Sequence, residues 1–189
     1  MTLFIIGLTL FFIPHFYSAV RSRAEGKDKR VSIGEAKYMG TYSVITLIGF
    51  VLMIWGYTPI PDGPSLYEGP HELHHYSWVF MLPAFILLAA AYTPLGYIKR
   101  SVQHPMMHGT LIWAIFHLAL GGDLKRIILF GAFAAYAIIS LAGGYKRGTD
   151  FKGVKPNFMG DILAIIVGLV ITGAFMHGGH QVLFGTSPF

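Results

Sequence analysis

The stretch Thr2–Val20 reads TLFIIGLTLFFIPHFYSAV and contains no Asp, Glu, Lys or Arg. A helix needs about 20 mostly apolar residues to cross the hydrocarbon core of a bilayer, so this stretch predicts a membrane span. No basic segment precedes it, and Pro14, His15 and Tyr17 interrupt its apolar core. That pattern is not typical of a cleaved secretory signal, and we expect a retained helix.

Five further apolar blocks follow the first one along the chain. Each has a length and composition that predict a membrane-spanning helix. The six predicted spans are residues Thr2–Val20, Tyr38–Tyr57, Tyr76–Tyr97, His104–Leu120, Ile127–Gly144 and Phe158–His177. The fold class predicted from these blocks is all-α, a polytopic membrane protein with a bundle of six transmembrane helices.

The composition of the 189 residues supports this class. Hydrophobic residues make up 54% of the chain and charged residues only 12%, against roughly 25% in an average soluble protein. A soluble enzyme of this size needs more charge to cover its surface, so that class is excluded. The length fits one domain over residues 1–189. The chain has no Cys, which excludes disulfides, thiolate ligands and Cys nucleophiles.

The net charge of +5 is concentrated in the short gaps between the apolar blocks. The gaps after the first, third and fifth blocks hold twelve of the 14 Lys and Arg residues, and the other two gaps hold two. Basic loops face the cytoplasm, so both termini are predicted on the non-cytoplasmic side. The same distribution indicates a membrane surface, and no nucleic-acid partner is expected.

Small residues occur repeatedly within three of the predicted spans, where they allow helices to approach closely. We expect such packing at Gly40, Gly49, Gly56, Gly131, Ala134, Ala135, Gly160, Gly168 and Gly173.

Four of the nine His residues lie inside predicted spans: His15, His104, His108 and His117. Ionisable groups at membrane depth are expensive and usually functional. Neutral imidazole is a good ligand for haem iron or another transition metal. The alternative is that each imidazole only forms a hydrogen bond with a neighbouring helix.

The remaining His residues lie in an outer loop and at the end of the last span. In the loop, His71 and His75 could share a helical turn and chelate a metal, but solvated surface residues are the better interpretation of the group His71, His74 and His75. The roles of His177 and His180 are left open, including whether they converge with the loop. We expect Asp161 to stabilise a helix N-terminus and not to act in catalysis.

A family resemblance is carried by residues 104–123, which read HPMMHGTLIWAIFHLALGGD. This segment resembles the signature of the NnrU family at His104-Pro105, Gly109, Trp113, His117 and Gly122-Asp123. Further matching features are His15 followed by Arg21, the group Gly34, Glu35 and Tyr38, and the run Ile54-Trp55-Gly56-Tyr57. The resemblance covers about residues 1–145 and carries little of the last helix.

The resemblance implies a bacterial inner-membrane protein linked to denitrification and nitric oxide metabolism. The zeta-carotene isomerases of plants and cyanobacteria look like the same family, and they carry haem b between two His residues. The positions matching that ligand pair are His15 and His117, which the resemblance therefore implies as metal ligands. It also implies an isoprenoid, carotenoid or quinone as a ligand, or a redox role.

Depth in the membrane favours a different partner for His15. If the first and fourth spans are centred near Phe11 and Ile112, His15 and His108 both lie about 6 Å inside the midplane, and His117 lies about 7 Å outside it. The resemblance favours His15 with His117, and we adopt that pair. His104, His108 and Arg21 are then expected near the haem, with Arg21 pairing with a propionate.

The chain also departs from the family pattern. Ala36 stands where the family usually has Arg, and an isomerase that exchanges imidazole for an axial thiolate is not available to a chain without Cys. One alternative is a non-enzymatic accessory or assembly subunit of a larger membrane complex. Another is a membrane methyltransferase using S-adenosylmethionine, because residues 103–109 resemble a segment of such enzymes, although its Arg and Tyr are missing.

Overall fold

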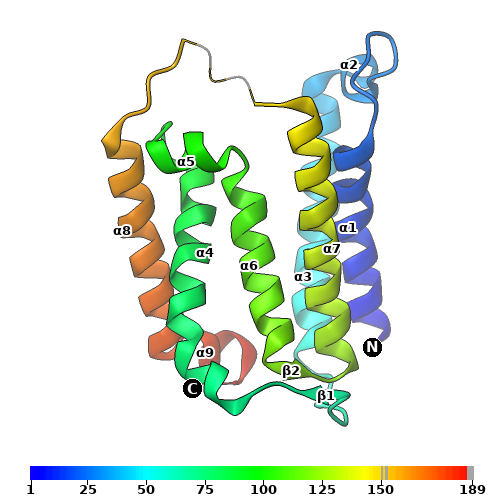
Figure 1. Cartoon of the computed structure of the whole chain (residues 1–189). Coiled ribbons are helices and arrows are strands. Elements are labelled where there is room, and N and C mark those ends of the chain that lie inside the picture. Colours follow the sequence, from blue (N-terminus) through cyan, green and yellow to red (C-terminus); the bar gives the residue numbers. More distant parts are fainter. Residues whose placement is uncertain (150, 152, 187–189) are drawn as a thin grey trace. The chain divides into compact units, whose positions relative to one another are not determined.

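The computed structural model describes residues 1–149, 151 and 153–186, and helices dominate it (Figure 1). Five helical segments are long and apolar enough to cross a membrane: Thr2–Val20, Glu35–Tyr57, His71–Tyr92, Leu124–Arg147 and Phe158–Phe184. The all-α class and the membrane character of the chain are therefore confirmed. The chain divides into two compact units, Met1–Asp62 and Gly63–Phe189.

The fourth predicted span is a helix but falls short of spanning length. Helix α6 runs over Pro105–Ala119, 15 residues, which is about 22 Å against a hydrocarbon core of about 30 Å. Gln103 has a φ of 62°, which is not helical and separates α6 from the preceding helix, and Pro105 occupies the first turn of α6. Gly121, with φ 95°, follows its end. These non-helical residues limit α6 at both ends, so the helix is shorter than the predicted span of residues 104–120.

The first unit is an antiparallel pair of helices, α1 (Thr2–Val20) and α3 (Glu35–Tyr57), joined through the short α2 (Lys29–Ile33). A Cβ built on Gly49 would lie 2.5 Å from the backbone nitrogen of Phe11. Cβ atoms on Gly7 and Gly56 would meet the partner helix's backbone as closely. The predicted close approach is confirmed at Gly49 and Gly56. It is wrong for Gly40, which has nothing within 4 Å of its Cβ position.

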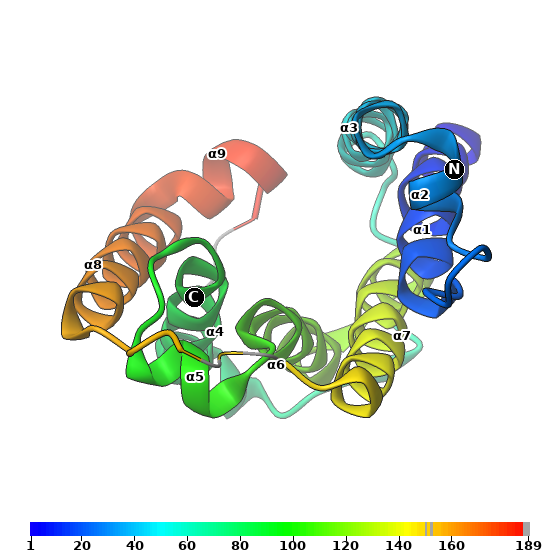
Figure 2. The same cartoon turned by 90° about the horizontal axis from the view of Figure 1, so that it is seen from above.

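In the second unit the helices form a row in the order α8, α4, α6, α7 (Figure 2). Helix α4 (Ser77–Tyr92) packs between α8 (Phe158–Ala174) and α6, and α7 (Leu124–Arg147) packs on the other side of α6. Cβ atoms on Gly160 and Gly168 would collide with the segment Ile86–Gly96, so the predicted packing there is confirmed. Gly131 and Gly173 have open space beside them, and the prediction is wrong for both.

Short elements close the two ends of the second unit. At one end, β1 (Tyr67–Glu68) pairs antiparallel with β2 (Gly121–Gly122), and the 3-10 helix η1 (His71–Tyr76) leads into α4. At the other end, α5 (Tyr97–Val102) precedes α6. The Asp161 carboxylate accepts hydrogen bonds from the backbone N–H groups of Tyr97 and Ile98. Asp161 lies in the first turn of α8, but the helix N-terminus that these hydrogen bonds stabilise is that of α5.

The outer surface of the helices is apolar, as a bilayer environment requires. Large apolar side chains stay exposed along α8 although they are among the most hydrophobic in the chain. These include Ile162, Leu163, Ile165, Ile166, Leu169 and Val170. In water such a surface would be an aggregation hazard, whereas lipid tails solvate it. The exposed side chains therefore support a lipid bilayer as the surroundings of this chain.

Candidate functional site

His117 lies near the C-terminal end of α6, half-buried against α7. Its Nδ1–H donates to the carbonyl oxygen of Trp113, one helical turn earlier, at 2.7 Å. A carbonyl oxygen only accepts, so the proton must be on Nδ1 and the lone pair on Nε2. Among the described residues Nε2 has no hydrogen-bond partner. His117 therefore presents an acceptor nitrogen with no hydrogen-bond partner among the described residues.

Aromatic rings surround this imidazole and fix its plane. Phe130 of α7 stacks on it with ring centroids 4.5 Å apart and an interplanar angle of 23°. Trp113 lies 5.1 Å from it and contacts both Phe130 and Phe133 edge to face. The rings restrict water near His117 and leave little freedom for the imidazole to turn.

A second imidazole, that of His180, lies near His117. The His180 ring lies 6.5 Å from that of His117, centroid to centroid, with only 15° between the planes. Its Nδ1–H donates to the carbonyl oxygen of Thr186 at 2.7 Å. The sequence did not predict this meeting. His177, three residues earlier, is exposed.

A bend between α8 and α9 (His180–Phe184) brings His180 to this position. The turn η2 (Phe175–Gly179) has π-helical hydrogen bonding and leaves helical geometry at His177 and at Gly178, whose φ is 123°. Gly tolerates this φ, which other residues rarely adopt. The sequence signal for the bend is the Gly178-Gly179 pair, which interrupts an otherwise apolar block.

His104 and His108 meet at the opposite end of α6. His108 shares hydrogen bonds with the His104 carbonyl oxygen at 3.0 Å and, through Nε2, with the Tyr145 hydroxyl at 3.1 Å. The Nε2 atom of His104 is buried, has no partner among the described residues, and lies against Gly144, whose Cβ would come within 2.7 Å. His108 and His117 are nine residues apart, about 13 Å along the helix. The structure therefore separates His104 and His108 from His117.

His15 belongs to the first unit, so it is described apart from His117. Its Nδ1–H donates to the Phe11 carbonyl oxygen at 2.6 Å, and its ring stacks on Phe11 with a centroid distance of 4.2 Å. Tyr42 of α3 lies 5.2 Å away. The pair of His15 and His117 stays a prediction from the family resemblance.

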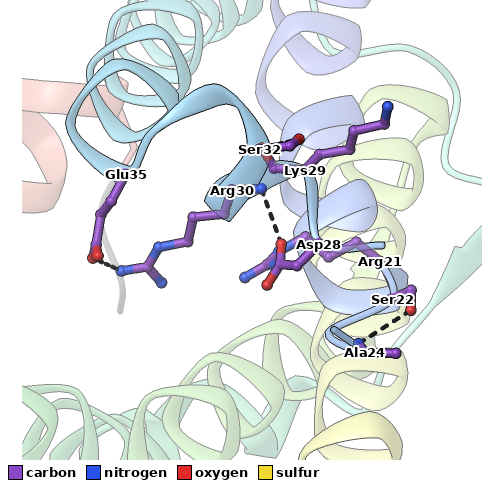
Figure 3. Close-up of polar contacts among 8 residues, drawn as sticks. All are labelled: Arg21, Ser22, Ala24, Asp28, Lys29, Arg30, Ser32 and Glu35. Atoms are coloured by element: carbon purple, nitrogen blue, oxygen red, sulfur yellow. Dashed lines mark hydrogen bonds and ion pairs between the residues drawn. The ribbon is translucent and has the colours of Figure 1, made fainter. Parts of the chain in front are cut away.

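Arg21 follows α1 directly and is held by an acid. Its Nη1 pairs with the carboxylate of Asp28, and its guanidinium lies 5.7 Å from the centre of the Tyr38 ring. Asp28 also caps α2 by accepting from the backbone of Arg30, which in turn pairs with Glu35 (Figure 3). A haem propionate at Arg21 would have to compete with Asp28.

The pKa of the Asp28 carboxyl lies below its ordinary value, first because of the hydrogen bond from Arg21. The backbone hydrogen bond from Arg30 and the charges of Arg21 and Arg23 act in the same direction. Desolvation opposes them. The pair is therefore charged over the whole neutral range.

Among the described residues, the His residues of the loop before α4 do not gather into a metal centre. His71 and His74 lie 5.7 Å apart, centroid to centroid, and His71 and His75 are exposed. In the part of the chain that the structure describes, no three His, Asp or Glu side chains gather closely enough to hold a metal ion. A metal held by the described residues must therefore have most of its ligands from another source, such as a cofactor.

The fold and these side chains define a class, that of a multi-pass helical membrane protein with imidazoles directed between its helices. Comparison with protein families places the chain more closely. The NnrU family, described as NnrU protein, matches residues 3–188, so the chain belongs to this family. The match runs through the last helix, well beyond the region of about 1–145 in which we recognised the signature. No curated protein and no solved structure gives a significant match.

Proposed function

We propose that this chain is an inner-membrane haem b protein in which the His117 imidazole would hold the iron. The observation that carries the proposal is the environment of the His117 imidazole. Its Nδ1–H is hydrogen-bonded to the Trp113 carbonyl oxygen, its Nε2 has no hydrogen-bond partner among the described residues, and Phe130 stacks on its ring. Haem ligands are usually held in this way, because a backbone acceptor on one nitrogen orients the other and raises its basicity.

The second ligand expected from the family resemblance is His15. If both imidazoles held the iron, the group would serve electron transfer rather than direct binding of a small molecule. When bound, haem b supplies an iron that changes between the ferrous and ferric states. The Trp113 carbonyl oxygen accepts the hydrogen bond from the imidazole Nδ1–H, and Phe130 covers one face of the ring.

Family membership supports a link with denitrification and nitric oxide metabolism, where such a redox centre has a use. An isoprenoid, carotenoid or quinone is the class of ligand that suits a site between apolar helices. An accessory role in a larger membrane complex is compatible with the same haem. Stoichiometric co-purification with a reductase in mild detergent would favour that role.

The test is haem content in the full chain. The protein is expressed in haem-replete cells, purified in mild detergent, and examined by reduced-minus-oxidised absorption spectra. We expect His117→Ala to lose or shift the haem bands, because the iron loses an axial nitrogen. The control is His71→Ala, which removes an exposed imidazole in the loop and should leave the spectrum unchanged. Identical spectra for His117→Ala and the wild type would contradict the proposal.

The proposed topology has six spans, with both termini on the non-cytoplasmic side. Helix α6 is the fourth span in chain order and brings the total to six despite its 15 residues, because local thinning of the bilayer accommodates a short helix at modest cost. An even number of spans places both termini on one side, and five spans place them on opposite sides. Reporter fusions that fluoresce only in the cytoplasm distinguish these cases: neither terminus should give fluorescence. Fluorescence from one terminus would contradict six spans.

A further inference from the structure

A cavity of about 460 Å³ lies beside the connection between α1 and α3. Its volume falls within the range of small-ligand sites, roughly 300–1,000 Å³. The residues that line it are mostly charged: Arg21, Arg23, Asp28, Arg30, Val31 and Glu35. We propose that this cavity binds the phosphate of an anionic phospholipid headgroup. This phosphate takes the place of the haem propionate expected at Arg21, and its binding does not require haem.

The length of α1 places the cavity at the depth of lipid headgroups. Helix α1 has 19 residues, about 28 Å, which nearly equals the hydrocarbon core of about 30 Å. Arg21 follows its last residue directly and has left helical geometry, with ψ 147°. The Arg21 guanidinium therefore lies at the level of the lipid phosphates, whichever side of the membrane this end of α1 faces.

The charges around the cavity favour an anion. Residues 21–37 contain six Lys or Arg and three Asp or Glu, so this segment has a net charge of +3. Of the six lining residues, three are Arg and two are acids. A phosphodiester carries a negative charge and several acceptor oxygens, which match the planar fork of N–H donors on a guanidinium.

Ion pairs orient two of these arginines without using all of their donors. Arg21 pairs with Asp28 through Nη1. Arg30 pairs with Glu35 through Nη2 (Figure 3). A guanidinium has five N–H donors, and the Nε of Arg21 is buried with no hydrogen-bond partner among the described residues. Arg21 is therefore held in place by Asp28 and the Tyr38 ring, and it keeps donor capacity that the described residues do not use.

Apolar side chains beside the cavity indicate the source of the phosphate. Tyr17 and Val20 in the last turn of α1 are exposed, and so is Val31, which lines the cavity. A soluble phosphate gains nothing from these neighbours. A phospholipid lays its acyl chains along α1 and brings its phosphate to the arginines, so it contacts both kinds of surface. A lipid headgroup therefore fits the site better than a soluble anion.

The experiment measures lipid binding to the full chain by native mass spectrometry. The protein is released from detergent micelles with graded amounts of phosphatidylglycerol, or of phosphatidylcholine, which has the same phosphate but no net charge. We expect the first phosphatidylglycerol to bind more tightly than the first phosphatidylcholine, and equal affinities would overturn the proposal. Millimolar inorganic phosphate should not displace the bound lipid. Displacement would assign the cavity to a soluble anion and overturn the lipid assignment.

A pair of variants with the same change of charge tests where the lipid binds. Arg23→Gln removes an arginine of the cavity and should weaken phosphatidylglycerol binding roughly tenfold or more, as the loss of a hydrogen bond to a charged group does. Its control is Lys27→Gln, which removes the same charge from an exposed side chain outside the cavity. The control should weaken binding by no more than about fivefold. Equal losses would indicate general attraction to a basic surface and would contradict the proposed site.

Removal of an acid tests the sign of the charge effect. Glu35→Gln releases Arg30 and makes the cavity more positive, so phosphatidylglycerol should bind more tightly than to the wild type. Glu25→Gln changes the charge equally in the same segment but outside the cavity. A Glu35→Gln protein that binds no more tightly than Glu25→Gln would overturn the proposal. All four substituted side chains are exposed, so each variant should fold as the wild type does, which circular dichroism checks.

Discussion

Substitution of Gly49 by Ala tests how closely the two helices of the first unit pack. The added Cβ would lie 2.5 Å from the Phe11 nitrogen and 2.8 Å from the Leu10 carbonyl carbon, where ordinary contact begins at 3.4 Å. The helices must separate locally by about 0.9 Å, the difference between 3.4 and 2.5 Å. Backbone atoms cannot yield as a flexible side chain can, and helix association in lipid depends on such packing.

The expected cost of Gly49→Ala follows from two opposing effects. Overpacking costs about 1–3 kcal/mol, and replacing Gly by Ala within a helix returns about 0.5–1 kcal/mol. We expect a net loss of about 1–2 kcal/mol in the free energy of unfolding. Gly40→Ala in the same helix is the matched control, since nothing lies within 4 Å of its Cβ position. It should gain about 0.5–1 kcal/mol.

The assay is reversible unfolding in mixed detergent with increasing dodecyl sulfate, followed by far-ultraviolet circular dichroism. The two single-methyl variants should differ by about 2 kcal/mol, or roughly thirtyfold in the folding equilibrium. If Gly49→Ala is as stable as Gly40→Ala, the helices are not packed backbone to backbone, and the description of the first unit is wrong.

Two further predictions concern the ion pair of Arg21 with Asp28 and the contact of His104 with Gly144. The pKa of Asp28 is lowered in the folded state, so the ion pair with Arg21 stabilises the fold at pH values above the ordinary carboxyl pKa. This stabilisation is lost as the pH falls through the lower folded-state pKa. The unfolding free energies of the wild type and Asp28→Asn should therefore differ at neutral pH and converge at low pH, and a difference that stays constant with pH would contradict this. Gly144→Ala should displace the His104 ring and lower the free energy of unfolding by about 1–3 kcal/mol. Gly131→Ala in the same helix is the control, because its Cβ position has open space beside it. Equal thermal stability of the two variants would refute the contact between Gly144 and the His104 ring.

Most of the helical architecture could be predicted from the sequence, because apolar length directly reflects bilayer thickness. The first predicted span and α1 have the same bounds, Thr2–Val20. The α6 boundary could not be predicted in the same way. Its break depends on the positive φ of Gln103, and nothing in an apolar block marks a non-glycine residue for that conformation.

The candidate site was predicted only in part. Residue type and the family resemblance identify His117 as a ligand candidate, and its hydrogen bond to Trp113 and its stacking on Phe130 are compatible with that assignment. The closeness of the His180 ring to His117 depends on a π-turn and on packing between helices distant in sequence, which no local pattern encodes. The same reason explains the glycines: Gly40 and Gly49 look alike in sequence, and only the position of α1 distinguishes them.

The most direct test of the central claim is the absorption spectrum of the purified, haem-replete wild-type protein, recorded oxidised and then after dithionite. A haem b bound between two imidazoles predicts a sharp Soret band that moves to longer wavelength on reduction, with resolved visible bands and about one haem per chain. A folded, helical and colourless preparation from the same cells would contradict the account.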